Sequence, residues 1–378
     1  MITFIHLSDS HLGFTDNDLL DDEGQNIREQ DVYDAFSQSV DIILREDPDF
    51  VLHTGDIFHR SSPSNRALIF AASQLLRITN AGIPFYMIAG NHDFPRTFQT
   101  APIHELFSMN TGAVIACSEQ LQVIEKPEYI LHLFPHCNSD SSFEQELEKI
   151  AVTDNTKPNI LAMHLSFGTY LMDEFGERVF PESKAGLLKQ FSYVAMGHWH
   201  KFQKMEKYGN VWYAGSTERT SVSQAGYDMG VVKVTIDSDL KPELLPVKLR
   251  EFAKVIVKNC STKTEDEIKD ELNKQVKIYH PEGSIFHFLL EDVNLSQQSQ
   301  FTTAILSEFI PAALWFTVSK TSAATGEIIT AESGSEALKD GLARHLRQQL
   351  DEVDFIKADT IISKLWQEVE EEEAAIAS

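Results

Sequence analysis

Cysteine is scarce in this 378-residue chain, which has only Cys117, Cys137 and Cys260. Three cysteines at distant positions favour neither a disulfide framework nor a cysteine-based zinc site. No apolar run approaches the roughly 18 residues that a membrane-spanning helix requires. The first residues, MITFIHLSD, lack the basic segment of a signal peptide and are typical of a strand. We therefore expect a cytoplasmic protein that does not span a membrane.

Positive charge is also in short supply. The chain has 32 lysines and arginines against 57 aspartates and glutamates, which gives a formal net charge of −25. This balance argues against the broad basic surface that many nucleic-acid-binding proteins have. It does not exclude nucleic acid, because bound divalent cations would offset some carboxylates and local basic patches can form on an acidic protein.

What the chain does have is a regular alternation of strand and helix patterns. Apolar runs typical of strands occupy 3–8, 49–54 and 83–89, and helical spacing occupies 32–46 and 65–80. Strands separated by helices indicate a largely parallel sheet with helices on its faces. The length and the hydrophobic content of 42% are those of a globular protein with two or more domains.

After position 110 strand-like runs become more frequent. We expect them to form a second sheet, partly antiparallel, packed on the first. The runs are AVIAC, LQVIE, YILHLFP, NILAMH, YVAMGH, NVWYAG and GVVKVTI.

The composition changes after about position 245. The strand-like runs FAKVIVKN, SIFHFLL and ALWFTVSK, with helical patterns between them, predict a small α/β module. One of its helices should begin at the capping box Thr264-x-x-Glu267, and another should run through FTTAILSEFI.

The last segment follows a polar joint, TSAATGE, and shows two apolar helical stripes. They could pack on the protein's own module or dock on a partner. The stripes comprise Leu338, Leu342, Leu346 and Leu350, then Ile361, Ile362, Leu365, Trp366 and Val369.

Five predicted strands end in aspartate, histidine or asparagine. In a parallel sheet these ends meet at one edge, where open α/β folds place ligands. Carboxylates and neutral imidazoles without thiolates are donors for borderline or hard divalent metals. The residues are Asp9 and His11, Asp56 and His59, Asn91 and His92, His164, and His198 and His200. Asp9 and His11 are two residues apart, so the side chains of both can point to one side of an extended segment.

Each of these pieces alone has an ordinary structural explanation. A buried histidine is usually a hydrogen-bonded core residue, and Gly-Asp and Gly-Asn are common turn dipeptides. His6, His53, His132 and His136 match no ligand spacing, and we interpret them as structural. The ordered conjunction of five polar strand ends is what favours a metal centre.

The ordered set DSH…GDIFH…GNHD…MH…GHWH resembles the calcineurin-like metallophosphoesterase superfamily. Within it the chain is most similar to the SbcD family, the bacterial counterpart of the meiotic-recombination-eleven nuclease of double-strand-break repair. GDIFH with His59, the Ser-Ser-Pro-Ser segment, Arg28-x-x-Asp31 and the small α/β module carry that resemblance. The resemblance implies a four-layer α/β/β/α sandwich over 1–247, a capping domain over 248–325 and C-terminal helices over 333–378.

The resemblance also implies roles for the polar strand ends. One ion would be held by Asp9, His11, Asp56 and His200. A second would be held by Asp56, Asn91, His164 and His198, with Asp56 as the bridge. His92 would donate a proton to the phosphoryl or leaving oxygen, and His59 would contact the scissile phosphate. We expect Asp93 to be a structural partner that could orient an imidazole. The family's preferred ion is manganese, with zinc or iron as alternatives that the donors also allow.

The function implied is a manganese-dependent DNA nuclease that cuts ends, hairpins and single strands, as a 3′→5′ exonuclease and an endonuclease. Its implied partner is an SbcC-type coiled-coil ATPase bound through the C-terminal helices, and a homodimer is compatible with the resemblance. One alternative is a phosphoesterase of the same fold that acts on nucleotides or small phosphodiesters, which the acidic charge favours. Another is a non-catalytic scaffold, which the intact ligand set disfavours.

Overall fold

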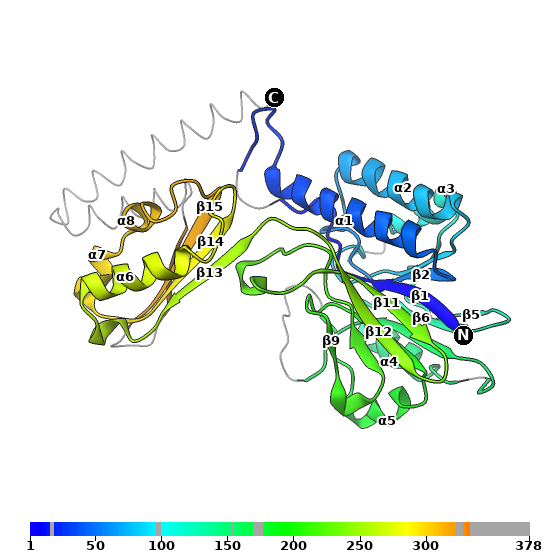
Figure 1. Ribbon diagram of the computed structural model, residues 1–378. Coiled ribbons are helices and arrows are strands. Elements are labelled where there is room, and N and C mark those ends of the chain that lie inside the picture. The colour runs from blue at the N-terminus through cyan, green and yellow to red at the C-terminus, as the bar shows by residue number, and fades with distance from the viewer. Residues whose placement is uncertain (16–18, 96–99, 153, 169–176, 323–327, 333–378) are drawn as a thin grey trace, which may run out of the picture. The chain divides into compact units, whose positions relative to one another are not determined.

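The computed structural model describes residues 1–15, 19–95, 100–152, 154–168, 177–322 and 328–332. The C-terminal helices predicted over 333–378 lie outside the described residues. Contacts divide the chain into two units, Met1–Leu249 and Arg250–Ser378, and each unit is described by itself (Figure 1). Among the described helices, none combines the length and the apolar character needed to cross a membrane.

Two six-stranded sheets form the first unit. The order in the first sheet is β12 (Leu240–Pro246), β11 (Gly230–Ile236), β1 (Ile2–Leu7), β2 (Phe50–His53), β3 (Phe85–Ile88) and β4 (Val114–Ala116). The order in the second is β5 (Gln122–Glu125), β6 (Ile130–Phe134), β7 (Asn159–His164), β8 (Tyr193–Gly197), β10 (Val211–Tyr213) and β9 (Gln203–Lys204). Strands β1 to β4 run parallel, as do β6, β7, β8 and β10, so each sheet collects several carboxyl ends along one edge.

Alternate residues of the first sheet face different layers. Phe4 and Phe50 stack on each other between the two sheets, with ring centroids 4.7 Å apart. Ile5 and Leu7, their neighbours on β1, pack instead against the helices on the outer face. The opposite face of the second sheet packs against its own helices through a third core, which includes Phe143.

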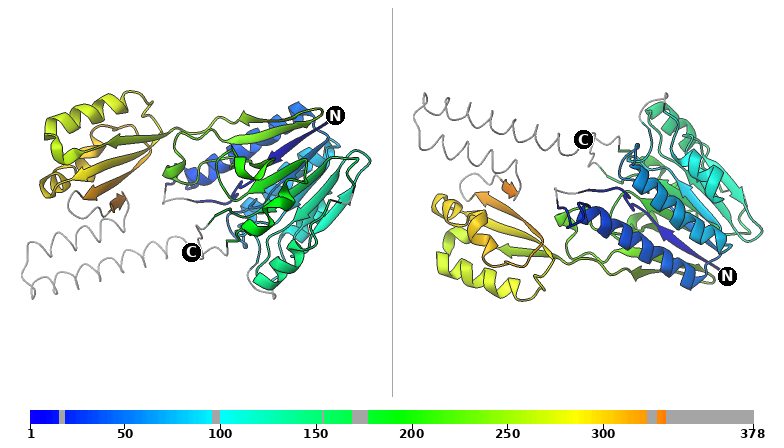
Figure 2. Two further views of the ribbon diagram at one scale, coloured as in Figure 1. Left: turned by 90° about the horizontal axis from the view of Figure 1, so that it is seen from below. Right: turned by 90° about the horizontal axis from the view of Figure 1, so that it is seen from above.

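The helices complete a four-layer α/β/β/α sandwich, which confirms the predicted fold class. In Figure 2, α1 and α2 run side by side over the first sheet. The outer helices of the first sheet are α1 (Ile27–Glu46), α2 (Asn65–Asn80) and α3 (His104–Thr111), and those of the second are α4 (Asp140–Leu147) and α5 (Ala185–Leu188).

The sheet assignment of two late strands was wrong. The runs AVIAC and GVVKVTI become β4 and β11, which belong to the first sheet and not to the second. Strand β11 pairs antiparallel with β1, with Ile236 opposite Ile2, and β12, which the sequence does not predict, follows it at the edge. An apolar run indicates a strand, but its partner is decided by long-range pairing that local pattern does not encode.

The described residues of the second unit form a four-stranded sheet covered on one face by three helices. Thr264 accepts a hydrogen bond from the Glu267 N–H while the Glu267 carboxylate accepts one from the Thr264 N–H, so the predicted capping box is confirmed. The pattern FTTAILSEFI contains only the short helix α8. The elements are β13 (Phe252–Val257), β14 (Ile285–Val293), β15 (Trp315–Ser322), β16 (Ile328–Glu332), α6 (Glu265–Val276), α7 (Leu295–Gln300) and α8 (Thr303–Ser307). The sequence predicts neither α7 nor β16.

Candidate metal centre

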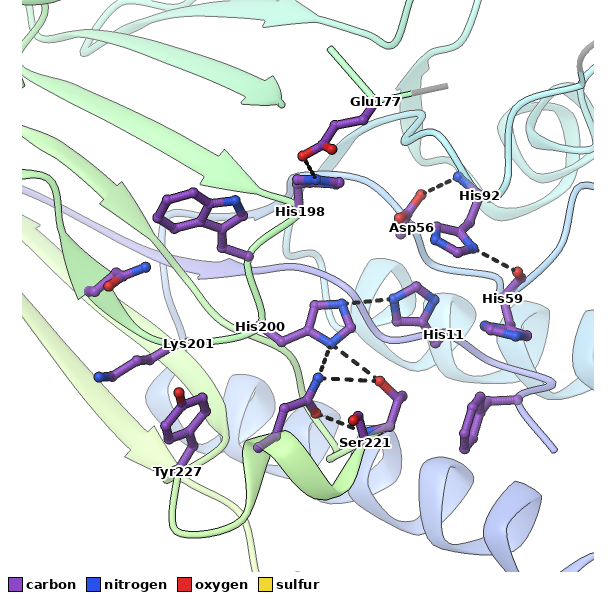
Figure 3. Close-up of a pocket in the computed structure, with 15 residues that line it drawn as sticks. His11, Asp56, His59, His92, Glu177, His198, His200, Lys201, Ser221 and Tyr227 are labelled. Carbon is purple, nitrogen blue, oxygen red and sulfur yellow. Dashed lines mark hydrogen bonds and ion pairs between the residues drawn. The ribbon is translucent and has the colours of Figure 1, made fainter. Parts of the chain in front are cut away.

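The polar strand ends of both sheets meet at one cavity of about 740 Å³ in the first unit (Figure 3). Loops after β1, β2 and β3 enter from the first sheet, and the ends of β7 and β8 enter from the second. Of the predicted site residues, His11, Asp56, His59, His92, His198 and His200 line the cavity. Asp9, Asn91 and His164 are buried beside them, so all nine lie together.

The first group of donors surrounds one carboxylate oxygen. Asp9 Oδ1 lies 4.0 Å from His11 Nε2 and 3.7 Å from His200 Nε2. These two imidazole nitrogens are 3.1 Å from each other. Asp9 Oδ1 also lies 3.9 Å from His164 Nε2 of the second group, so this oxygen is close to both groups.

The second group converges on His164. Its Nε2 lies 3.1 Å from Asp56 Oδ2 and 3.0 Å from Asn91 Oδ1. The same Asn91 oxygen is 3.2 Å from His198 Nδ1. Its other nitrogen, His164 Nδ1, lies 2.7 Å from the backbone carbonyl oxygen of Thr54, which makes Nδ1 the donor and leaves Nε2 to face the group.

These donor sets fit divalent metal ions. Asp9 Oδ1 is buried and accepts no hydrogen bond, which is costly for a carboxylate oxygen unless a cation binds it. Donors bound at about 2.1 Å to one ion lie roughly 3–4 Å from each other, the range of spacing found in both groups. Oxygen and imidazole donors without thiolate suit manganese, iron or zinc. The fold family's divalent ions therefore have suitable ligands in this chain.

Left-handed backbone brings the ligands together, and this the sequence did not predict. Asp9, His11, Asp56 and His198 have φ angles of 50°, 46°, 54° and 95°. The side chains of Asp9 and His11 do point to one place, as predicted, but on a left-handed backbone and not on an extended segment. Non-glycine residues with positive φ cost on the order of 1 kcal/mol or more each and cluster at functional sites.

The carboxylates of Asp9 and Asp56 are each held in place by a backbone N–H from the loop after another strand. The His198 N–H donates to Asp9 Oδ2, and the His92 N–H donates to Asp56 Oδ1, both at 2.9 Å. Gly90 allows the second contact, because a Cβ at this position would lie 2.1 Å from Asp56 Oδ1. Both carboxylates thus have fixed orientations before any ion binds.

Charge in the second group is balanced by a proton. Burial disfavours charge on Asp56 and His164, yet their mutual attraction outweighs it. The pKa of Asp56 consequently lies well below its ordinary value, and the pKa of His164 lies well above it. Since a ligating imidazole must be neutral, an ion that binds here would displace the His164 proton. Burial, followed by the neighbouring His200, instead lowers the pKa of His11.

His92 and His59 lie beside the donor groups at the cavity wall. His92 Nδ1 is 3.3 Å from the backbone carbonyl oxygen of His59, and the two ring centroids are 5.6 Å apart. Burial, and then the charge of His92, lowers the pKa of His59 to about 4. His59 is thus neutral near pH 7 and can contact a phosphate only through a neutral hydrogen bond. A ring nitrogen of each, with one from His11, lies within 4.8 Å of the others.

Asp93 has a structural position. Its carboxylate accepts hydrogen bonds from the N–H groups of Ile57 and Gly90, at 2.7 Å and 2.9 Å. It also lies 3.3 Å from Nε2 of His104. Asp93 therefore links the loops after β2 and β3 and orients no ligand imidazole among these contacts.

The four histidines that the sequence analysis interprets as structural are all buried: His6, His53, His132 and His136. His6 lies between the hydroxyl groups of Tyr193 and Thr54, 3.0 Å from each oxygen. Burial followed by His53 lowers the pKa of His6 to about 3, so this ring is neutral in the folded chain.

Two partners of the predicted ligand histidines were missed in the sequence. Glu177 Oε1 lies 2.6 Å from His198 Nε2, the nitrogen that faces away from Asn91. Gln224 Nε2 lies 2.8 Å from His200 Nδ1. Neither residue follows a strand-end motif or has a diagnostic spacing, so no local signal marks it. A carboxylate such as that of Glu177 fixes the tautomer and the orientation of a metal-binding imidazole, whereas the Gln224 amide fixes only the orientation of the His200 ring.

Comparison with known proteins gives a matching family and several relatives. The family described as calcineurin-like phosphoesterase matches residues 2–202, which include every predicted metal-binding residue. Proteins named DNA double-strand break repair protein Mre11 are similar to the chain as well. The one from Sulfurisphaera tokodaii is 28% identical over 293 residues, 76% of this chain and 73% of that protein.

Two further relatives of the same name match shorter regions. The Methanococcus maripaludis protein is 31% identical over 230 residues, or 58% of each chain. The Sulfolobus acidocaldarius protein is 32% identical over 201 residues, 53% of this chain and 50% of that protein. The chain therefore spans between half and three quarters of the length of these three relatives.

Proposed function

Because this chain belongs to the calcineurin-like phosphoesterase family, we propose that it is a metal-dependent DNA nuclease of double-strand-break repair. It is a phosphodiester hydrolase, and relatives named for double-strand break repair favour DNA as its substrate. The observation that carries the proposal is the convergence of two groups of oxygen and imidazole donors at one cavity, with His92 beside them.

The residues that would hold the ions are those of the two groups. Asp9, His11 and His200 would bind one ion and Asn91, His164 and His198 the other, with Asp56 shared. We propose manganese as the preferred ion, which the oxygen and imidazole donors suit. When bound, two ions would stabilise charge on the attacking and leaving oxygens and activate a water molecule.

The chain's own side chains supply positioning and proton transfer. If His92 Nδ1–H donates to the His59 carbonyl oxygen, Nε2 is left for the substrate. A protonated His92 would donate to the leaving oxygen, the role of a general acid. His59, which is neutral and lies beside His92, would hold a phosphate oxygen.

The second unit, from Arg250 onward, would act as a capping domain that helps to position DNA. It carries Lys254, Lys258, Lys263, Lys269, Lys274 and Lys277. Three of these form ion pairs, such as Lys269 with Glu265 and Lys263 with Glu271. Half of these six lysines are therefore paired with carboxylates among the described residues, and we expect DNA contact through them to be weak alone.

An SbcC-type ATPase would bind through residues 333–378, which lie outside the described residues. This part of the proposal rests on the resemblance and on the two apolar stripes of the sequence. A chain ending at Glu332 should keep manganese-dependent cleavage of short single strands and lose co-purification of the ATPase. Insoluble or inactive truncated protein would assign the stripes to the chain's own core.

Manganese-dependent cleavage is the test of the main proposal. The purified chain would be offered labelled duplex DNA, labelled single strands and a chromogenic small phosphodiester, with manganese, magnesium or excess EDTA. We expect DNA cleavage with manganese, less with magnesium and none with EDTA. Hydrolysis of the small phosphodiester alone would favour the alternative that the net charge of −25 supports, an enzyme for small phosphodiesters or nucleotides. Strong cleavage in EDTA would contradict the metal centre.

A further inference from the structure

The cavity at the metal centre extends beyond the two donor groups. Its lining also includes Trp199, Lys201, Gln203 and Tyr227, residues to which the proposed chemistry assigns no role. In the view of Figure 3, Lys201 and Tyr227 lie on the side of His200 that faces away from His11 and His59. A scissile phosphate with its attacking and leaving groups would occupy only the part beside the donors.

Lys201 has an unusual charge environment for this acidic chain. Among the described residues that line the cavity, it is the only lysine or arginine. Its side chain is exposed, and no described carboxylate forms an ion pair with it. An unpaired ammonium at the mouth of an otherwise anionic site is placed to bind an anionic group of the substrate.

Tyr227 provides an aromatic surface next to this ammonium. The Lys201 Nζ lies 5.0 Å from the centroid of the Tyr227 ring. The backbone carbonyl oxygen of Tyr227 accepts hydrogen bonds from Arg219 Nε and Nη2, at 3.2 Å and 2.7 Å. These contacts hold the tyrosine in place before substrate binds.

The loop that carries Tyr227 is also tied to the metal centre. Gln224, three residues earlier, has its amide nitrogen 2.8 Å from Nδ1 of His200. The Tyr227 N–H donates to the Gln224 carbonyl oxygen at 3.0 Å. The backbone position of Tyr227 is therefore set relative to a predicted ligand.

We propose that Lys201 and Tyr227 form a subsite for the nucleotide next to the scissile phosphodiester of a single strand. Lys201 would bind the neighbouring phosphate, and the Tyr227 ring would stack on the base, the combination that single-strand binding grooves use. This inference rests on the proposed nuclease function. It explains how an acidic chain would hold a polyanion at the site of cleavage.

Four variants of the full-length chain test the subsite: Lys201→Ala, Tyr227→Ala, Tyr227→Phe and Lys204→Ala. Lys204 is the matched control, because its ammonium also lies near an aromatic ring, 5.9 Å from the centroid of Trp212. It pairs with Glu206 at 2.9 Å and does not line the cavity. Each variant would be measured with manganese on a labelled single-stranded oligonucleotide and on bis(4-nitrophenyl) phosphate, which is too small to span both positions.

In the Lys201→Ala and Tyr227→Ala variants, loss of activity should be confined to the oligonucleotide substrate. Tyr227→Ala should lower its kcat/KM roughly ten-fold, and Tyr227→Phe should restore it, since the ring does the stacking. Lys201→Ala should weaken oligonucleotide binding and reduce the slope of log K against log salt by about 0.7, the value for one phosphate contact on a single strand. Lys204→Ala should match wild type on both substrates, and hydrolysis of the small diester should stay within about two-fold in all four.

The outcomes separate this inference from the proposed function. If wild type hydrolyses the small diester but does not cleave the oligonucleotide, the nuclease proposal fails, and the subsite fails with it. If wild type cleaves the oligonucleotide and Lys201→Ala behaves like Lys204→Ala, the subsite alone is wrong. Equal losses on both substrates would also overturn it, because they would show a general disturbance of the centre.

Discussion

Asp56 and His92 differ in what they contact, although they lie in one cavity. The Asp56 carboxylate is within 3.1 Å of the predicted ligand His164, whereas His92 is joined to the donors through its backbone N–H. Asp56→Asn should therefore weaken the binding of both ions and abolish cleavage. His92→Gln should lower kcat by roughly 10²–10⁴ and leave the metal content unchanged, because a proton donor acts mainly in the transition state.

Elemental analysis of both purified variants beside wild type, with cleavage assays, checks this difference. Loss of an ion from the His92 variant would make His92 a ligand. That result would point to the group formed with His11 and His59, whose ring nitrogens lie within 4.8 Å of one another.

Glu177, which no sequence motif marks, is the charged partner of the predicted ligand His198. Its carboxylate lies 2.6 Å from His198 Nε2. Glu177→Ala should therefore lower the affinity of the second group for its ion about 10- to 100-fold. Glu177→Gln keeps an acceptor oxygen and should lose less. Glu182→Gln is the control, since that carboxylate pairs with Lys207 and Tyr208 outside the cavity.

Titration with manganese, followed by electron paramagnetic resonance, counts the ions and gives their affinities without any substrate. Two ions of wild-type affinity in Glu177→Ala would show that the contact does not support the centre. Selective loss of the first ion would show that Glu177 acts elsewhere.

At the scale of elements, the loop after β3 requires glycine at position 90. A Cβ on Gly90 would lie 2.1 Å from Asp56 Oδ1 and 2.5 Å from the Asp56 backbone nitrogen. Gly90→Ala should displace Asp56, destabilise the fold by a few kcal/mol and weaken manganese binding. Gly186→Ala, where no atom lies within 4 Å of the added Cβ, is the control.

Urea unfolding in EDTA and manganese titration measure the two effects of Gly90→Ala separately. Wild-type values for both would mean that the loop moves freely enough to accept a methyl group. The held position of Asp56 would then not be a requirement of the centre.

The sequence predicts the elements that end at the centre better than the way in which they meet. Strands β1, β2, β3, β7 and β8 and helix α2 were predicted because apolar runs and helical spacing are local signals. The left-handed φ of Asp9 and His198 was not, since both residue types usually adopt other conformations. The place of β11 beside β1 and the contact of Glu177 with His198 depend on tertiary packing, which single-sequence patterns do not record.

For the whole molecule, the buried histidines make stability depend on pH. Burial is the main reason that the pKa values of His6, His53 and His136 fall to about 3. Each folded pKa is below the ordinary value of 6.5, so the unfolded chain binds more protons in acid. Stability is therefore lost as pH falls from about 6.5 toward 3, by about 2 kcal/mol for each such histidine at pH 5.

Urea unfolding in EDTA at pH 7.5 and pH 5 tests this sign. His6→Asn should be less stable than wild type at pH 7.5, because it loses the contacts with Tyr193 and Thr54. It should nevertheless lose about 2 kcal/mol less than wild type between the two pH values. An identical loss in both proteins would mean that His6 is protonated in the folded chain.

Glu218 should give the opposite pH dependence. Burial raises its pKa to about 7, although the Arg28 guanidinium, 3.6 Å away, acts against this. A folded pKa above the unfolded value of about 4.5 means that the contribution is complete below pH 4.5 and is lost as pH rises through 7. Wild type should thus gain about 2 kcal/mol from Glu218 between pH 7.5 and pH 5, which offsets part of the histidine loss. Glu218→Gln removes this gain, so its unfolding midpoint should fall more steeply in acid than that of wild type. A shallower fall would show that Arg28 keeps the carboxylate charged and that the ion pair outweighs burial.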